Sequence, residues 1–236
     1  MTASAVFSCQ AMSQTTSTVK TVGIKKGQHE VEFKAGTIRQ RGDERKYGAS
    51  VGYEYGITHF WSTKLSIDYA RQAPAGTGLE EIAWQNKFRL TPPDRFPLDV
   101  GLLTEIGWAK DRSEGYRFKF GPLFEKKIDA VQLNANFLFE RYSGETPARE
   151  TEMSYQWQAK YEWKEDFQFG LQGFGEMGPW NDWAPRSEQS HLLGPVLFGE
   201  VSLGSDQKLE YSVAYLADPS SRARSHGFRM KVEYIF

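Results

Sequence analysis

Several residue types that carry chemistry are scarce in this chain. Its 236 residues include one cysteine, Cys9, which excludes an intrachain disulfide framework and a zinc site built on cysteines. The four histidines lie at positions 29, 59, 191 and 226, and no two have the i, i+4 spacing of a helical metal site. Phosphate-binding glycine loops and dinucleotide fingerprints are missing as well. We therefore expect no metal and no cofactor.

Neither sign of charge dominates, and long apolar runs are missing. The 29 Lys and Arg residues nearly cancel the 30 Asp and Glu residues, and no basic run occurs. This composition predicts no nucleic-acid partner. No stretch of 18 apolar residues occurs, which excludes a transmembrane helix. The length fits one domain.

Aromatic residues and glycines are abundant instead, and apolar residues recur with period 2. The chain holds 7 Trp, 11 Tyr, 16 Phe and 22 Gly. Near the C-terminus, Phe228, Met230 and Val232 alternate with Arg229 and Lys231, as in a half-buried strand. About twelve such segments occur, each of about the length that a tilted strand needs to cross a bilayer. We expect strands near 29–40, 46–58, 63–71, 79–91, 98–109, 115–126, 130–142, 152–164, 166–177, 192–204, 207–217 and 226–236.

The connections between these segments alternate in length. Short ones fall near 59–64, 92–97, 126–130, 164–166 and 204–207, and longer ones near 72–78, 143–151, 178–191 and 218–225. Such alternation is expected of a membrane barrel with short periplasmic turns and longer external loops. The predicted fold is all-β, an antiparallel up-and-down transmembrane β-barrel of about 12 strands, formed by residues 29–236.

Period 2 alone does not determine which face meets lipid, because a soluble barrel would turn its apolar face inward. Charged residues share the polar face with glycines such as Gly48 and Gly107, which suits a crowded lumen. Aromatic residues such as Trp84 and Trp108 lie toward the ends of the apolar faces, as in interfacial girdles. These features favour an apolar face that contacts lipid.

The C-terminus carries a resemblance to a known class. The chain ends Val-Glu-Tyr-Ile-Phe, and a terminal Phe236 on an alternating aromatic strand resembles the sorting signal of Gram-negative outer-membrane barrels. The resemblance covers about residues 29–236 and identifies no substrate family. It implies a location in the bacterial outer membrane. It also implies that the partners are outer-membrane lipids, lipopolysaccharide and the barrel-assembly machinery.

Residues 1–28 precede the first expected strand. Ser8–Ala11 resembles the end of a cleavage site, but Met1–Ala11 contains no positive charge, so we interpret residues 1–28 as a leader remnant or a flexible periplasmic N-terminus. The residues before Cys9 match a lipid-anchoring signal poorly.

Assigning the polar face to the lumen places about thirteen acidic and ten basic side chains there. Unpaired charges in a narrow lumen are costly, so this mixture predicts ion pairs between neighbouring strands. Arg117 and Lys119 are expected to pair with Glu105 and with Glu140. At the seam between the first and last strands, Glu32 and Lys34 are expected to pair with Lys231 and Glu233. The candidate lumen-lining residues are Glu32, Lys34, Glu54, Lys87, Arg89, Glu105, Arg117, Lys119, Glu140, Lys160, Arg229 and Lys231.

Three functions remain open. The first is a narrow porin-like channel for small polar solutes or ions. The second is a structural or surface-binding barrel with a plugged lumen, in which loop arginines such as Arg186 contact lipopolysaccharide phosphates. The third is a lipid-modifying enzyme that uses Ser190–His191 or Ser225–His226. Because adjacent strand residues point to opposite faces, neither dipeptide is itself a catalytic dyad, and we favour a role without catalysis.

Overall fold

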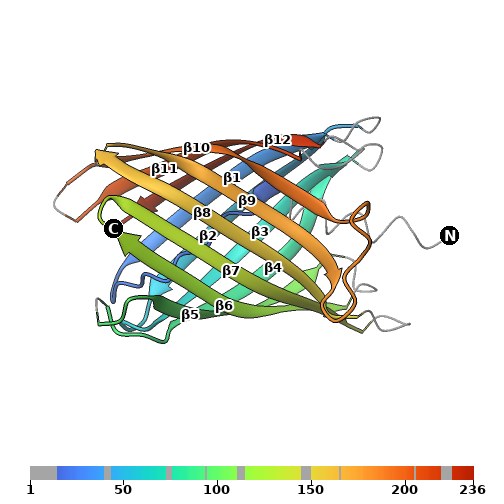
Figure 1. Ribbon diagram of the computed structural model, residues 1–236, viewed down its shortest axis with the longest axis horizontal. Coiled ribbons are helices and arrows are strands. Elements are labelled where there is room, and N and C mark those ends of the chain that lie inside the picture. The colour runs from blue at the N-terminus through green and yellow to red at the C-terminus, as the bar shows by residue number, and fades with distance from the viewer. Residues whose placement is uncertain are drawn as a thin grey trace.

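The chain forms a closed barrel of twelve antiparallel strands, in which each strand pairs with its neighbours in sequence and β1 pairs with β12 (Figure 1). The computed structural model describes residues 15–39, 44–72, 76–93, 95–110, 115–144, 150–164, 166–204, 206–218 and 225–236. The strands are β1 (His29–Arg39), β2 (Lys46–Gly56), β3 (Trp61–Gln72), β4 (Gly76–Arg89), β5 (Asp99–Ala109), β6 (Tyr116–Ile128), β7 (Val131–Ser143), β8 (Glu152–Lys164), β9 (Phe167–Pro179), β10 (Ser190–Ser202), β11 (Lys208–Ala217) and β12 (His226–Ile235).

The predicted fold class and strand number are confirmed, and the strand limits agree within a few residues. The predicted alternation of connection lengths is wrong at two places. β3 and β4 remain paired as far as Gln72 and Gly76, which leaves three residues between them. The connection from β4 to β5 is longer, because nine residues, Leu90–Leu98, separate the two strands. Three prolines lie in this connection, and proline cannot donate a ladder hydrogen bond.

The two ends of the barrel differ. One end, which we call the turn end, carries the first residue of β1 and Phe236. There the backbone N–H of His29 donates to the Phe236 carbonyl oxygen at 2.9 Å. The rings of His29 and Phe236 stack with centroids 5.3 Å apart, and the His29 Nδ1 lies 2.6 Å from the Tyr53 hydroxyl. The opposite end, which we call the loop end, carries the connections from β1 to β2 and from β9 to β10.

The apolar face of the strands points outward. Leu65, Val51 and Phe169 are 54%, 47% and 42% exposed, whereas Ser50 and Asn136 are buried. In water such a belt would be an aggregation surface, so lipid is the solvent of the exterior. The described part of the chain contains no helix long and apolar enough to cross a membrane. The prediction that the apolar face contacts lipid is thus confirmed by the inverted pattern of burial.

Adjacent residues on β3 provide a matched test of the two faces. Ile67 points outward from the middle of the strand, and Ser66 lines a lumen cavity. Ile67→Arg should lower the free energy of unfolding by about 2–4 kcal/mol, because it puts a charge at the depth of the bilayer midplane. Ser66→Arg should lower it by less than Ile67→Arg does, because its guanidinium enters a polar cavity that Asp68, Glu80 and Glu81 also line and not hydrocarbon. Urea unfolding from lipid vesicles, followed by tryptophan fluorescence, measures both. Equal costs, or the reverse order, would contradict the assignment of faces.

Candidate functional site: the lumen and its N-terminal segment

Residues Thr15–Gln28 lie inside the barrel, and we call them the lumen segment. At its start, the carbonyl oxygen of Thr15 would be 2.0 Å from a Cβ on Gly36, in the loop-end half of β1. Near its end, the carbonyl oxygen of Lys25 would be 2.0 Å from a Cβ on Gly56, at the turn end of β2. The segment therefore runs along the barrel axis toward the turn end, and glycines in the wall make room for its backbone.

Strand alternation contains no signal for such a segment. The sequence predicts a leader remnant or a flexible terminus for residues 1–28, and residues 1–14 lie outside the described part of the chain. The described remainder packs against the wall at several points. Thr15 and Val22 are each only 1% exposed.

Two apolar patches in the lumen receive the two valines of the segment. Val22 packs with Leu103 of β5, Leu123 of β6 and Leu138 of β7, and we call these three leucines the first patch. Val19 packs on a second patch, which comprises Ile38, Phe174, Leu192, Val196, Ala214 and Leu216. Burying a valine side chain contributes about 1.5–3 kcal/mol, so the two contacts form a substantial part of the attachment.

Polar wall groups bind the backbone of the segment. The Val22 N–H donates to Glu125 Oε2 at 3.1 Å, and the Asn136 side-chain amide donates to the Lys20 carbonyl oxygen at 3.0 Å. The Arg229 guanidinium donates to the Ser17 carbonyl oxygen at 3.1 Å. These bonds satisfy peptide groups that would otherwise be buried without partners.

Two cavities beside the segment are larger than the small pockets around it. The outer cavity, of about 110 Å³, is lined near the loop end by Glu81, Arg117 and Glu140 among others. The inner cavity, of about 250 Å³, is lined near the turn end by residues that include Glu30 and Lys231. Both volumes exceed the space that one water molecule needs. The two cavities share a wall of four residues, namely Thr18, Lys20, Lys64 and Gln85.

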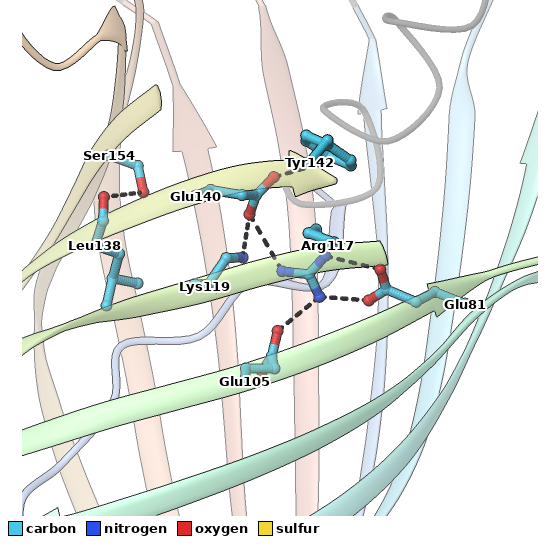
Figure 2. A network of polar contacts seen from close by, with 8 residues as sticks. All are labelled: Glu81, Glu105, Arg117, Lys119, Leu138, Glu140, Tyr142 and Ser154. Carbon is cyan, nitrogen blue, oxygen red and sulfur yellow. Dashed lines mark hydrogen bonds and ion pairs between the residues drawn. The ribbon is translucent and has the colours of Figure 1, made fainter. Parts of the chain in front are cut away.

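Arg117 on β6 lies at the centre of a cluster of carboxylates in the outer cavity (Figure 2). Its Nη2 is 2.6 Å from Glu105, and its Nη1 is 3.2 Å from Glu140. Lys119 lies 2.8 Å from the same Glu140 oxygen that Arg117 contacts. The predicted pairing of Arg117 and Lys119 with Glu105 and Glu140 is confirmed.

The cluster has a further member that the sequence pattern did not connect with Arg117. Both nitrogens on one side of the guanidinium bond Glu81 of β4, with Nε donating to Oε2 at 2.7 Å. Arg117 reaches past β5 because Gly107 lies directly opposite it there. A Cβ on Gly107 would be 2.2 Å from Glu81 Oε2, so a larger residue there would displace the Glu81 carboxylate from this position. A register shift between Asp68 and Tyr69 of β3 adds a residue to β4 beside Glu81.

A second set of ion pairs lies where the two cavities meet. Glu32 accepts from Lys64 across β2 and lies 3.2 Å from Lys34 on its own strand. Glu54 accepts from Ser62 at 2.6 Å and from Lys87 at 3.2 Å. The side chains of all of these residues are largely buried, so each charge is stabilised by its immediate partners.

The predicted partners at the seam are wrong. The β1–β12 register puts Glu32 opposite Glu233, and Lys34 opposite Lys231, so like charges face each other. Each lysine instead pairs with the glutamate two residues along its own strand, at 3.2 Å for Lys34 and 2.7 Å for Lys231. Side chains two apart on a strand share a face, which makes this pairing available.

The structure distributes the candidate lumen-lining residues unequally. Nine of them line one of the two cavities: Glu32, Lys34, Glu54, Lys87, Glu105, Arg117, Lys119, Glu140 and Lys231. Arg229 stacks over the Phe174 ring, 4.1 Å from its centroid. Lys160 lies 5.7 Å from the Phe198 ring centroid, and Arg89 pairs with Asp99 at 2.9 Å. These last three residues border neither cavity.

The ring of His191 contacts a tyrosine and a glutamine. The His191 Nδ1 lies 2.9 Å from the Tyr155 hydroxyl, and its Nε2 lies 2.9 Å from the Gln189 side-chain oxygen. The neighbouring Ser190 borders a small lumen pocket. Within the described ranges, no group of three or more His, Cys, Asp or Glu residues is arranged to hold a metal ion.

Most of the loop arginines expected to contact lipopolysaccharide lie outside the described part of the chain. Arg186 is exposed in the connection from β9 to β10. Five others lie outside the described residues: Arg41, Arg112, Arg149, Arg222 and Arg224. Contact with lipopolysaccharide and recognition by the barrel-assembly machinery stay predictions.

Comparison with known proteins defines the class of the barrel. No family model and no curated protein matches the sequence. Among solved structures, the NanC porin aligns with a TM-score of 0.59 at 11% identity over 86% of this chain and 98% of that one. The KdgM porin aligns with a TM-score of 0.53 at 8% identity over 87% and 98%. An outer-membrane channel from Pseudomonas putida F1 aligns with a TM-score of 0.59 at 9% identity over 92% and 96%.

Identities this low establish the fold alone, and that fold is shared by bacterial outer-membrane barrels. Together with the apolar exterior, it defines the chain as a transmembrane β-barrel with the architecture of outer-membrane barrels. The predicted class is confirmed.

Arg117 provides the test of the lumen network. Arg117→Gln should lower the free energy of unfolding by about 3 kcal/mol or more, because it removes the cation with which Glu81, Glu105 and Glu140 all form ion pairs. The matched control is Lys127→Gln, which removes an ion pair to Glu162 from a lysine side chain that is 61% exposed, and it should cost less than about 1 kcal/mol. Urea unfolding from vesicles compares the two. Equal small costs would show that water in the lumen already screens the Arg117 cluster.

Proposed function

We propose that this barrel is a narrow outer-membrane channel for small polar solutes or ions. The path leads through the outer and inner cavities, which follow one another along the barrel axis. The observation that carries the proposal is their common wall. Because Thr18 and Lys20 of the lumen segment and Lys64 and Gln85 of the wall border both cavities, movement of the segment and of these side chains would connect them.

The charges that line the cavities support polar solutes. The outer cavity is bordered by five acidic and five basic side chains, namely Asp68, Glu80, Glu81, Glu105 and Glu140 with Lys20, Lys34, Lys64, Arg117 and Lys119. The inner cavity has the same balance, from Glu30, Glu32, Glu54, Glu210 and Glu233 with Lys20, Lys64, Lys87, Lys208 and Lys231. Balanced charge repels neither cations nor anions strongly, whereas an apolar solute would have to displace bound water. This favours weak ion selectivity.

The similar solved structures support a role in the passage of solutes across the membrane. NanC and KdgM are both described as porins, and one KdgM structure is a complex with disordered oligogalacturonate. The barrels align over nearly the whole length of those chains. We do not assign the solutes of NanC and KdgM to this chain, for which we propose only the class of small polar solutes.

A second candidate, a structural barrel with a plugged lumen, is favoured by the lumen segment itself. The segment fills the space between its two apolar patches. If it never moves, the cavities stay separate and the barrel contributes only to the envelope or its surface. Electrical recording separates the two candidates, because a permanently plugged barrel gives no current.

Reconstituted protein in planar bilayers should give discrete conductance steps with a cation-to-anion permeability ratio near one. Lys119→Gln should raise that ratio by about twofold or more, because it removes fixed positive charge from the outer cavity. The matched variant Glu105→Gln, on the neighbouring strand, should lower the ratio by a similar factor. Reversal potentials in a salt gradient give these ratios, and heat-modifiable gel mobility confirms folding. Identical reversal potentials in all three proteins would place the current outside this lumen.

A further inference from the structure

We propose that the lumen segment is a detachable plug, and that the wall it occupies is a binding site for an extended peptide with two apolar side chains three residues apart. Release of the segment opens the channel. The inference rests on the proposed channel function and adds to it a gate and a ligand class.

The wall is built to hold a peptide. Glu125, Asn136 and Arg229 bond backbone groups of the segment, and such bonds are available to any extended chain in this position. The two apolar patches hold the side chains of Val22 and Val19. These patches lie on strand faces that otherwise carry charge, so they have no role in contacts with lipid. A peptide is a ligand that can use both the hydrogen bonds to backbone groups and the two apolar patches.

The attachment is of a kind that can reverse. The segment joins the β-sheet near its end, where Gly27 donates to the Gly56 carbonyl oxygen at 2.8 Å and Gly56 donates to the Gln28 carbonyl oxygen at 2.9 Å. Gly27 has a φ of +78°, and a Cβ on Gly23 would meet nothing within 4 Å. Two glycines thus flank the turn-end part of the segment, and glycine permits the backbone rotations that a hinge needs.

The segment also keeps the two cavities apart. Thr18 and Lys20 belong to it, and both border the outer and the inner cavity. The remaining residues of the common wall, Lys64 and Gln85, are long side chains of β3 and β4. Removing the segment therefore joins the two cavities.

The first experiment locks the plug. In a Cys9→Ser background, Thr15→Cys and Gly48→Cys place two thiols on facing residues. A Cβ on Gly48 would lie 3.0 Å from the Thr15 Cβ, so a shift of about 0.5 Å brings the pair into the range of a disulfide. The oxidised protein should show at least tenfold lower open probability in planar bilayers than the same protein after reduction. Cys9→Ser alone should not respond to oxidant. Equal currents before and after reduction, with disulfide formation verified by mass spectrometry, would overturn the plug.

The second experiment removes the plug and returns it. Deletion of residues 1–24 should raise the conductance several-fold. A synthetic peptide of residues 15–28, added to the truncated barrel, should restore the low conductance in a concentration-dependent way. The same peptide carrying Val19→Asp and Val22→Asp is the matched control and should leave the current unchanged, because aspartate cannot occupy the apolar patches.

The outcomes separate the two proposals. A truncated barrel that folds by heat-modifiable mobility but passes no current overturns the channel. A truncated barrel whose conductance equals that of the whole chain overturns the plug and leaves the channel standing. If both peptides block equally, or neither does, the wall is no specific peptide site. Should truncation prevent folding, the disulfide-locked protein still decides whether the segment gates the lumen.

Discussion

The constraint on which the rest of this structure depends is that a backbone in lipid must satisfy its own hydrogen bonds. Only a closed sheet does so with strands, and closure leaves two faces with opposite solvents. Lipid contacts the apolar face, so most charged residues of the alternating pattern face a narrow lumen. The ion-pair clusters, the wall glycines and the site of the lumen segment are consequences of that crowding.

Crowding explains why glycine and charge occur together. A guanidinium reaches from β6 to Glu81 of β4 only because Gly107 leaves the intervening strand bare. Gly36 and Gly56 make room for backbone in the same way, at the two ends of the lumen segment. In each case the missing Cβ creates a path for a polar group to a partner, and a buried polar group without a partner is costly. The positions of these lumen glycines are therefore set by the polar groups beside them.

The fold followed from the sequence because period 2 is a local signal that needs only one strand at a time. Local pairs, such as Arg117 with Glu105 and Glu140 on adjacent strands, followed for the same reason. The seam pairs failed because their register depends on barrel closure, which no local pattern encodes. A shift of one residue in the β1–β12 register turns the side chains of one strand to the opposite face. A shift of two residues keeps the face but changes which side chains lie opposite each other. The contact between Arg117 and Glu81 was missed because it skips a strand.

The lumen segment left a trace in the sequence that strand alternation, taken alone, passes over. Phe137, Leu138 and Phe139 are consecutive apolar residues, so one of them must face the lumen, and Leu138 does. Leu103 and Leu123 also stand at lumen positions beside apolar neighbours. An apolar side chain that faces a charged lumen cannot reach the lipid on the other face, and its contact with water is unfavourable. It therefore requires an apolar partner from within the lumen. Residues that break alternation toward apolar on the lumen face are thus a general indication that a barrel holds an internal segment.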